Sequence, residues 1–172
     1  SAIAAYQSTL LSLSSNKTML SRSATFSNTG IGTASASATA TAGSYSFFVE
    51  KLATATQVSY AGLADTPTGT GMLDVKLGGA LAFSVDLATA DTDSNGTMTP
   101  RELAAAINAA PANAAKVSAS IVTINGTAQL ILSARDTGTA SAITLDASAL
   151  SNAAVKAALD PANATQVVAG QD

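Results

Sequence analysis

Residues 91–102, with the sequence DTDSNGTMTPRE, place several oxygen-bearing side chains at the spacing of a calcium-binding loop. The stretch matches D-x-[DN]-x-[DN]-G-x5-E, in which a glycine makes the sharp turn and oxygen atoms surround the ion. The predicted ligands are the side chains of Asp91, Asp93 and Asn95, the backbone carbonyl of Thr97 and both carboxylate oxygens of Glu102. The pattern thus indicates a Ca²⁺ site, and no other cofactor is expected.

The flanks of this loop favour a second interpretation. A calcium loop of this kind follows a helix, whereas residues 80–88 alternate apolar and polar side chains like a strand. Glu102 also has another predicted role, because Thr99-x-x-Glu102 is a capping box at the start of a helix. The alternative is a polar strand-to-helix loop whose Asp and Asn side chains form turns. The sequence leaves both interpretations open.

The residue types argue against an enzyme. The chain contains neither His nor Cys, which excludes thiol catalysis, disulfides and Cys/His zinc sites. The commonest general base is therefore missing, and no Ser has a plausible activating base. Gly-rich stretches such as residues 69–71 lack the Lys-Ser/Thr of a phosphate-binding loop. An enzyme domain is the least favoured of the functional hypotheses.

Composition limits the core and the partners. The 172 residues suit one or two small domains, and 47% are hydrophobic. Much of this share is Ala, with four Phe, three Tyr and no Trp, so we expect a thin core of small side chains. Charged residues make up 11% with a net charge of −3, and no basic cluster is present to attract nucleic acid or anionic lipid. No apolar stretch approaches the roughly 20 residues of a membrane span. Neither nucleic acid nor a membrane is an expected partner.

Residues 1–26 are predicted to form a helix with a narrow apolar stripe. Apolar side chains recur at spacings of three and four, which is the heptad pattern of a coiled coil. The stripe, which we expect to pack in a rod, consists of Ile3, Tyr6, Leu10, Leu13 and Leu20. No second heptad segment of similar length follows, so we expect the partner helix to come from outside this chain. The alternative is that the stripe packs on the β-rich remainder.

The segment after this helix is predicted to contain strands. Residues 33–42 alternate Ser or Thr with Ala, which suits either a strand or a flexible low-complexity linker. Tyr45, Phe47 and Val49 then share one face of the strongest early strand. Residues 61–71 are predicted to form a loop.

The remainder of the chain predicts an α+β fold. Two β-hairpins are expected, because the Gly-Gly pair at 78–79 and the Asn-Gly pair at 125–126 favour two-residue turns. The expected elements are a hairpin at 73–87, a helix at 99–110, a hairpin at 117–134, a short strand at 143–145 and a helix at 149–160. Their order between residues 73 and 146 is β-β-α-β-β-β.

Residues 43–57, GSYSFFVEKLATATQ, are similar to a Gly-x-Tyr-x3-Val-x2-Leu-Ala stretch near the N-terminus of the flagellar hook-associated protein 2 family. Residues 99–110, TPRELAAAINAA, and residues 132–145, LSARDTGTASAITL, resemble the helix and the ending of a flagellin-type repeat. The heptad helix resembles the rod domain. The loop DTDSNGTMTP departs from the short turn usual in the family.

The resemblance implies a secreted structural protein of the bacterial flagellum, extracellular at the filament tip, that caps the filament and promotes flagellin polymerisation. The implied partners are flagellin, further copies in a homo-oligomeric ring, and other hook-associated proteins. No catalytic residue is implied. The export signal and C-terminal helix of the family are expected outside these 172 residues. The alternative is a secreted adhesin or surface-layer β module with a calcium loop.

The domain division expected from pattern and resemblance has three parts. Residues 1–28 would form the N-terminal rod helix, which is half of a coiled coil. Residues 29–60 would contribute the first strands of a β-rich head domain. Residues 61–172 would form an α+β head domain with the flagellin-type repeat.

Overall fold

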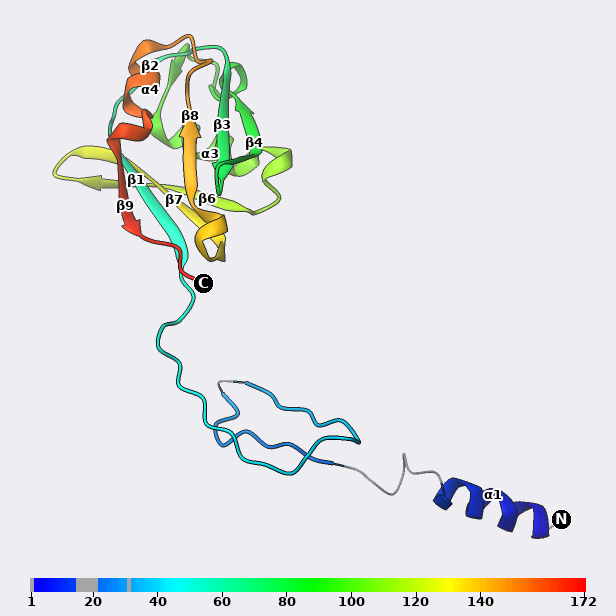
Figure 1. Cartoon of the computed structure of the whole chain (residues 1–172). Coiled ribbons are helices and arrows are strands. Elements are labelled where there is room, and N and C mark those ends of the chain that lie inside the picture. Colours follow the sequence, from blue (N-terminus) through cyan, green and yellow to red (C-terminus); the bar gives the residue numbers. More distant parts are fainter. Residues whose placement is uncertain (1, 15–21, 31) are drawn as a thin grey trace. The chain divides into compact units, whose positions relative to one another are not determined.

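A computed structural model describes residues 2–14, 22–30 and 32–172. The chain divides into two units, Ser1–Phe48 and Val49–Asp172 (Figure 1). Within the described residues, every strand lies in the second unit. The predicted division at residues 28 and 60 stays a prediction.

The N-terminal unit begins with α1 (Ala2–Ser14). The helix predicted over residues 1–26 is wrong over residues 22–26, which are not helical, and residues 15–21 lie outside the described part of the chain. Ser and Thr at the polar positions explain a shorter helix, because their side chains compete for backbone hydrogen bonds. Thr9 Oγ1, for example, donates to the carbonyl of Ala5 (2.9 Å).

The early strands are a second correction. Residues 33–42 and 45–49 are described, and neither range contains a strand. A strand needs a neighbour that satisfies its backbone N–H and C=O groups, and this unit supplies none among its described residues. Phe47 instead stacks on Phe26, with ring centroids 6.4 Å apart. The linker alternative for residues 33–42 agrees with this result.

The second unit contains three antiparallel sheets. Its strands are β1 (Ala55–Leu63), β2 (Thr66–Pro67), β3 (Met72–Leu77), β4 (Ala80–Asp86), β5 (Thr97–Met98), β6 (Val117–Ile124), β7 (Thr127–Thr137), β8 (Ile143–Asp146) and β9 (Ala164–Val168). The strand orders are β6-β7-β1-β9, β4-β3-β8 and β2-β5. The α-helices are α3 (Pro100–Ala109) and α4 (Ala153–Ala158), and the 3-10 helices are Leu87–Thr89, Pro111–Asn113, Thr139–Ser141 and Pro161–Asn163.

The helices connect these sheets. Helix α3 packs mainly on β6 and also contacts β4 and β7, so it lies between the larger sheet and the β4-β3-β8 sheet (Figure 1). Helix α4 contacts β1. The predicted α+β class is confirmed. The largest fully buried side chains come from β1, β3, β7, β8 and α3, from the 3-10 helix Leu87–Thr89 and from the C-terminal end of α4. They are Tyr60, Leu73, Leu87, Leu103, Ile107, Leu130, Leu132, Leu145 and Leu159.

This core also corrects the expectation of a core built from small side chains. Leu, Val and Ile supply most of it, and Ala supplies five of its residues: Ala90, Ala104, Ala119, Ala134 and Ala147. Composition misled because it counts all Ala residues equally, whereas many of them lie on the surface.

Both predicted hairpins are confirmed. Strands β3 and β4 pair across Gly78 and Gly79, whose φ angles are 56° and 83°. Strands β6 and β7 pair across Asn125 and Gly126, whose φ angles are 50° and 80°. Positive φ at both central positions matches the twist of the flanking strands, so these turns close the hairpins without splaying them.

Four strands differ from the sequence prediction, and one of them, β2 (Thr66–Pro67), lies within the loop predicted at residues 61–71. The two-residue strand β5 adds a member to the order β3, β4, β5, α3, β6, β7, β8. Strand β1 runs into the loop predicted at residues 61–71, and β9 follows α4 where no pattern was visible. Strands β1 and β9 lie side by side, with Ser59 opposite Thr165. These strands form because they pair with segments distant in sequence, and the alternation of apolar and polar residues within a strand does not predict such pairing.

Candidate functional site

The acidic loop joins a strand to a helix. Strand β4 ends at Asp86, whose carboxylate accepts a hydrogen bond from Ala88 N (3.0 Å) and caps the short 3-10 helix Leu87–Thr89. After the loop, Thr99 caps α3, and Pro100 occupies its first turn. The structure therefore supplies the exiting helix of a calcium loop, whereas a strand and a 3-10 turn replace the entering helix.

The loop brings three predicted ligands together. Carboxylate oxygens of Asp91, Asp93 and Glu102 lie within 4.8 Å of one another. Asn95 uses its side-chain oxygen differently, since Oδ1 accepts a hydrogen bond from Thr97 N (2.7 Å). Thr97 lies in β5, opposite Pro67 of β2. The convergence of the carboxylates agrees with the predicted pattern, and metal binding stays a prediction.

Protein donors already surround these carboxylates. Asp91 Oδ2 accepts hydrogen bonds from Thr68 Oγ1 (2.9 Å) and Gly96 N (2.9 Å). Both carboxylate oxygens of Asp93 accept from Asn95, one from its backbone N (3.1 Å) and the other from Nδ2 (2.8 Å). These contacts hold the loop in place by hydrogen bonds alone. Ca²⁺ would share oxygen lone pairs that protein donors already use, so we expect a weak site.

Glu102 fulfils the predicted capping box. Its Oε2 accepts from Thr99 N (2.9 Å) and from Thr99 Oγ1 (2.9 Å), while Thr99 Oγ1 accepts from Glu102 N (3.3 Å). Its Oε1 accepts from Thr92 N (3.1 Å) and from Thr92 Oγ1 (3.3 Å). One carboxylate thus ties the loop to the start of α3.

The same donors lower the pKa of two carboxyl groups. The hydrogen bond from Thr68 is the main cause that lowers the pKa of Asp91, with further contributions from Gly96 and Asn95. The backbone hydrogen bond from Thr99 is the main cause that lowers the pKa of Glu102. Both groups are therefore held as anions at neutral pH. This charge state suits either helix capping or cation binding.

Three described residues of the predicted rod stripe lie on α1 and are exposed. The side chains of Ile3, Tyr6 and Leu10 are 73%, 70% and 51% exposed. The side chain of Leu13 and the whole of Leu20 lie outside the described part of the chain. The described residues of the stripe therefore have an unburied apolar face.

A further apolar segment was expected as a strand and is instead an exposed chain. Its members are Tyr45, Phe47, Phe48, Val49 and Leu52, of which Phe48 is 91% exposed. The sequence contained the signal, because aromatic residues cluster there in a chain that has few of them. Clusters of large, solvent-exposed apolar side chains are typical of interaction surfaces.

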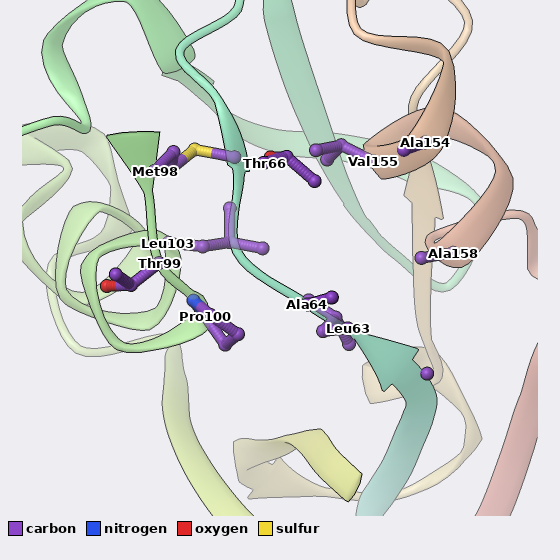
Figure 2. A pocket seen from close by; sticks show the side chains of 11 residues that line it. Leu63, Ala64, Thr66, Met98, Thr99, Pro100, Leu103, Ala154, Val155 and Ala158 are labelled. Atoms are coloured by element: carbon purple, nitrogen blue, oxygen red, sulfur yellow. The ribbon is translucent and has the colours of Figure 1, made fainter. Parts of the chain in front are cut away.

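Figure 2 shows a small cavity between β1, the start of α3 and α4. Leu63, Leu103 and Val155 line it from these elements, and its volume is about 60 Å³. Thr66 Oγ1 is buried beside it without a hydrogen-bond partner among the described residues. Ligand pockets are typically about 300–1,000 Å³, so this cavity is better matched to water than to a ligand.

Comparison with known proteins explains the N-terminal pattern. Residues 1–56 match the family model described as the flagellar hook-associated protein 2 N-terminus. The lateral flagellar hook-associated protein 2 of Vibrio parahaemolyticus is 35% identical over 158 residues, which are 89% of this chain and 35% of that protein. The chain is therefore similar to flagellar hook-associated protein 2, over residues 1–56 by the family model and over most of its length by this relative. The family resemblance inferred from the residues is confirmed.

A second curated relative covers almost the whole chain. The B-type flagellar hook-associated protein 2 of Pseudomonas aeruginosa is 33% identical over 177 residues, which are 99% of this chain and 36% of that protein. The chain thus spans about a third of the length of the curated relatives it matches.

Solved structures share the fold. The FliD crystal structure from Pseudomonas aeruginosa has a TM-score of 0.52 at 24% identity, covering 71% of this chain and 57% of that one. The flagellar cap protein FliD from Escherichia coli, solved as its D1-D2-D3 domains, has a TM-score of 0.51 at 25% identity. That match covers 70% of this chain and 36% of the Escherichia coli chain. The α+β architecture is therefore one known in flagellar cap proteins.

Proposed function

We propose that the protein containing this chain caps the tip of the bacterial flagellar filament and promotes the polymerisation of flagellin. Similarity to this family carries this proposal, because the curated relatives are flagellar hook-associated proteins 2 and the similar Escherichia coli structure is a flagellar cap protein. The role is structural and non-catalytic, and it relies on binding energy and shape. None of these relatives supports the adhesin or surface-layer alternative.

The proposed partners follow from this role. They are flagellin, further copies of the same protein in a ring at the filament tip, and neighbouring hook-associated proteins. The site of action is extracellular, at the distal end of the filament. Among the described residues, no helix combines the length and apolar character needed to cross a membrane.

The exposed stripe of α1 supports a rod that assembles with another helix. Burying an apolar side chain such as Ile3 or Leu10 contributes about 1.5–3 kcal/mol. An isolated helix of this length is marginal in water, so packing must supply much of its stability. We propose that Ile3, Tyr6, Leu10, Leu13 and Leu20 pack against a helix from elsewhere in the longer protein or from another subunit.

Complementation of a strain that lacks the full-length protein tests the proposal. We expect the unchanged protein to restore filaments, and Leu10→Asp to leave unpolymerised flagellin in the medium because a charge enters the packed stripe. Ser8→Asp is the matched control, since Ser8 lies about 200° around α1 from Leu10. Circular dichroism should show an intact head in both variants. Normal filaments in the deletion strain would contradict the capping role, and an unfolded head in Leu10→Asp would contradict the rod assignment.

A further inference from the structure

Strand β6 is an edge strand that has no bulge, no Pro and no charged residue. Its register with β7 continues from Val117 to Ile124 without a bulge. Residues 117–134 contain no charged residue and no Pro. Open N–H and C=O groups on a sheet edge pair readily with another strand, which is why edges usually have charges, prolines or bulges.

Two asparagine side chains protect the first half of this edge. Asn113 Oδ1 accepts from Val117 N (2.9 Å), and Asn113 Nδ2 donates to the Val117 carbonyl (2.9 Å). Asn108 makes the same pair with Ala119, at 2.8 Å for each hydrogen bond. Each amide satisfies the groups that a neighbouring strand would otherwise satisfy. The backbone N–H and C=O groups of Val117 and Ala119 point away from β7. Because alternate residues of a strand point their backbone groups to the same side, those of Ile121 and Thr123 also point away from β7.

The second half of the edge is open. Among the hydrogen bonds of the described residues, none pairs the outward backbone groups of Ile121 or Thr123. The neighbouring side chains of Val122 and Ile124 are 45% and 48% exposed. Unpaired backbone groups and exposed β-branched side chains therefore occur together over four residues.

We propose that this open half of β6 pairs antiparallel with the same segment of a second copy, about a two-fold axis at Val122. Ile121 of each copy would face Thr123 of the other, and these two pairs would exchange four backbone hydrogen bonds. The two Val122 residues would face each other as a non-hydrogen-bonded pair, in which side chains approach most closely. The register is limited on one side by the Asn108 contact at Ala119 and on the other by the turn at Asn125.

The absence of charge favours a second copy as the partner. In a two-fold contact the two copies of a residue near the axis lie close together, so a charge near Val122 would be repelled by its own copy. Residues 117–134 contain no charge, and the segment is self-complementary in this register. The inference does not depend on the capping role, because it concerns the head alone. Four hydrogen bonds make a weak contact, and because a two-fold contact is isologous it pairs two copies and is separate from the head-to-tail contacts that close a ring.

Single cysteines test the register, because the natural chain contains none. A non-hydrogen-bonded antiparallel pair places Cα atoms about 4.5 Å apart, within the range of a disulfide. We expect Val122→Cys in the 172-residue chain to form a disulfide-linked dimer under mild oxidation. Ser118→Cys is the matched control on the same exposed face of β6, and its copies would lie roughly 26 Å apart. Non-reducing electrophoresis should show dimer formation at least about tenfold faster for Val122→Cys.

A second variant tests the backbone hydrogen bonds. Thr123→Pro removes the outward N–H, and hence two of the four proposed bonds, while the β7 ladder is retained. Combined with Val122→Cys, it should slow cross-linking toward the rate of Ser118→Cys, with circular dichroism as the check on folding. Equal rates for the two cysteine variants would overturn the proposal even if Thr123→Pro fails to fold. Faster cross-linking of Val122→Cys to Val167→Cys of β9 would also overturn it, in favour of head-to-tail pairing of opposite edges.

Discussion

The two units of the chain treat apolar side chains in opposite ways. In residues 49–172, Ile107 and Leu132 are completely buried, whereas in residues 1–48 Ile3 and Tyr6 are 73% and 70% exposed. Both sets of residues lie on regular apolar patterns. A periodic pattern therefore indicates that an apolar face of a helix or strand packs against a partner, but it does not indicate whether that partner lies in the same chain.

The same truncation in each unit should give the largest contrast. Leu132→Ala should lower the free energy of unfolding by about 2–5 kcal/mol, because it leaves a cavity among packed side chains. Leu10→Ala should change it by less than about 0.5 kcal/mol, because Leu10 is already half exposed. Urea unfolding followed by circular dichroism measures both. A large loss in Leu10→Ala would mean that the stripe packs on the head.

The second contrast concerns two asparagines in the head. Asn113 is 1% exposed and bonds to Val117 twice and to the Ile107 carbonyl (3.0 Å). Asn113→Ala should cost about 1–3 kcal/mol, because buried backbone groups lose their partners. Asn163→Ala is the control, since Asn163 is exposed and donates one side-chain hydrogen bond, to Ala157 O (2.8 Å). Equal losses in thermal unfolding would remove the special role assigned to the buried amide.

The third contrast concerns pH, because an ion pair in residues 49–172 should make the free energy of unfolding depend on pH, whereas the uncharged strands should not. Lys76 Nζ lies 2.8 Å from Asp146 Oδ2, and this hydrogen bond is the main cause that lowers the pKa of Asp146. A carboxyl group whose pKa is lowered in the folded state stabilises the fold at pH values above its ordinary pKa of about 3.9. This contribution declines as the pH falls below that value. The stability difference between the natural chain and Asp146→Asn should therefore be present at pH 7 and shrink below about pH 4. A constant difference across this range would contradict the assignment.

Calcium should have the smallest effect. Free Ca²⁺ at about five times Kd would stabilise the fold by about 1 kcal/mol and raise Tm by about 2–4 °C. Asp93→Ala should abolish this gain, whereas Asp65→Ala, outside the loop, should keep it. Calorimetric titration after chelator treatment measures binding directly. A flat titration would leave the loop as a hydrogen-bonded turn and the capping proposal unchanged.

Local signals predicted the hairpins and the start of α3 correctly. The Gly78-Gly79 and Asn125-Gly126 turns need positive φ, and the Thr99 capping box satisfies donors within three residues, so neighbouring residues suffice to specify them. The convergence of Asp91, Asp93 and Glu102 was also visible, because these residues lie within one loop and the following turn of helix.

Other features depended on residues far away in the chain. Tyr45, Phe47 and Val49 alternate as a strand does, but no described strand pairs with them. Strand β9 has little pattern of its own and forms because β1 offers it an edge. The Asn108 and Asn113 contacts that cover half of β6 gave no sequence signal, because asparagine is also common in turns.

The sequence by itself determined the local turns, the helix cap, the α+β class and the family resemblance, since each depends on neighbouring residues or on a short ordered pattern. Only the tertiary structure decided which strands form, how they divide into sheets and which edge stays open. The physical reason is that a strand acquires its hydrogen bonds and its buried face from partners distant in sequence. The apolar stripe of α1 is specified by a local sequence pattern, but the partner that would bury it is not among the described residues.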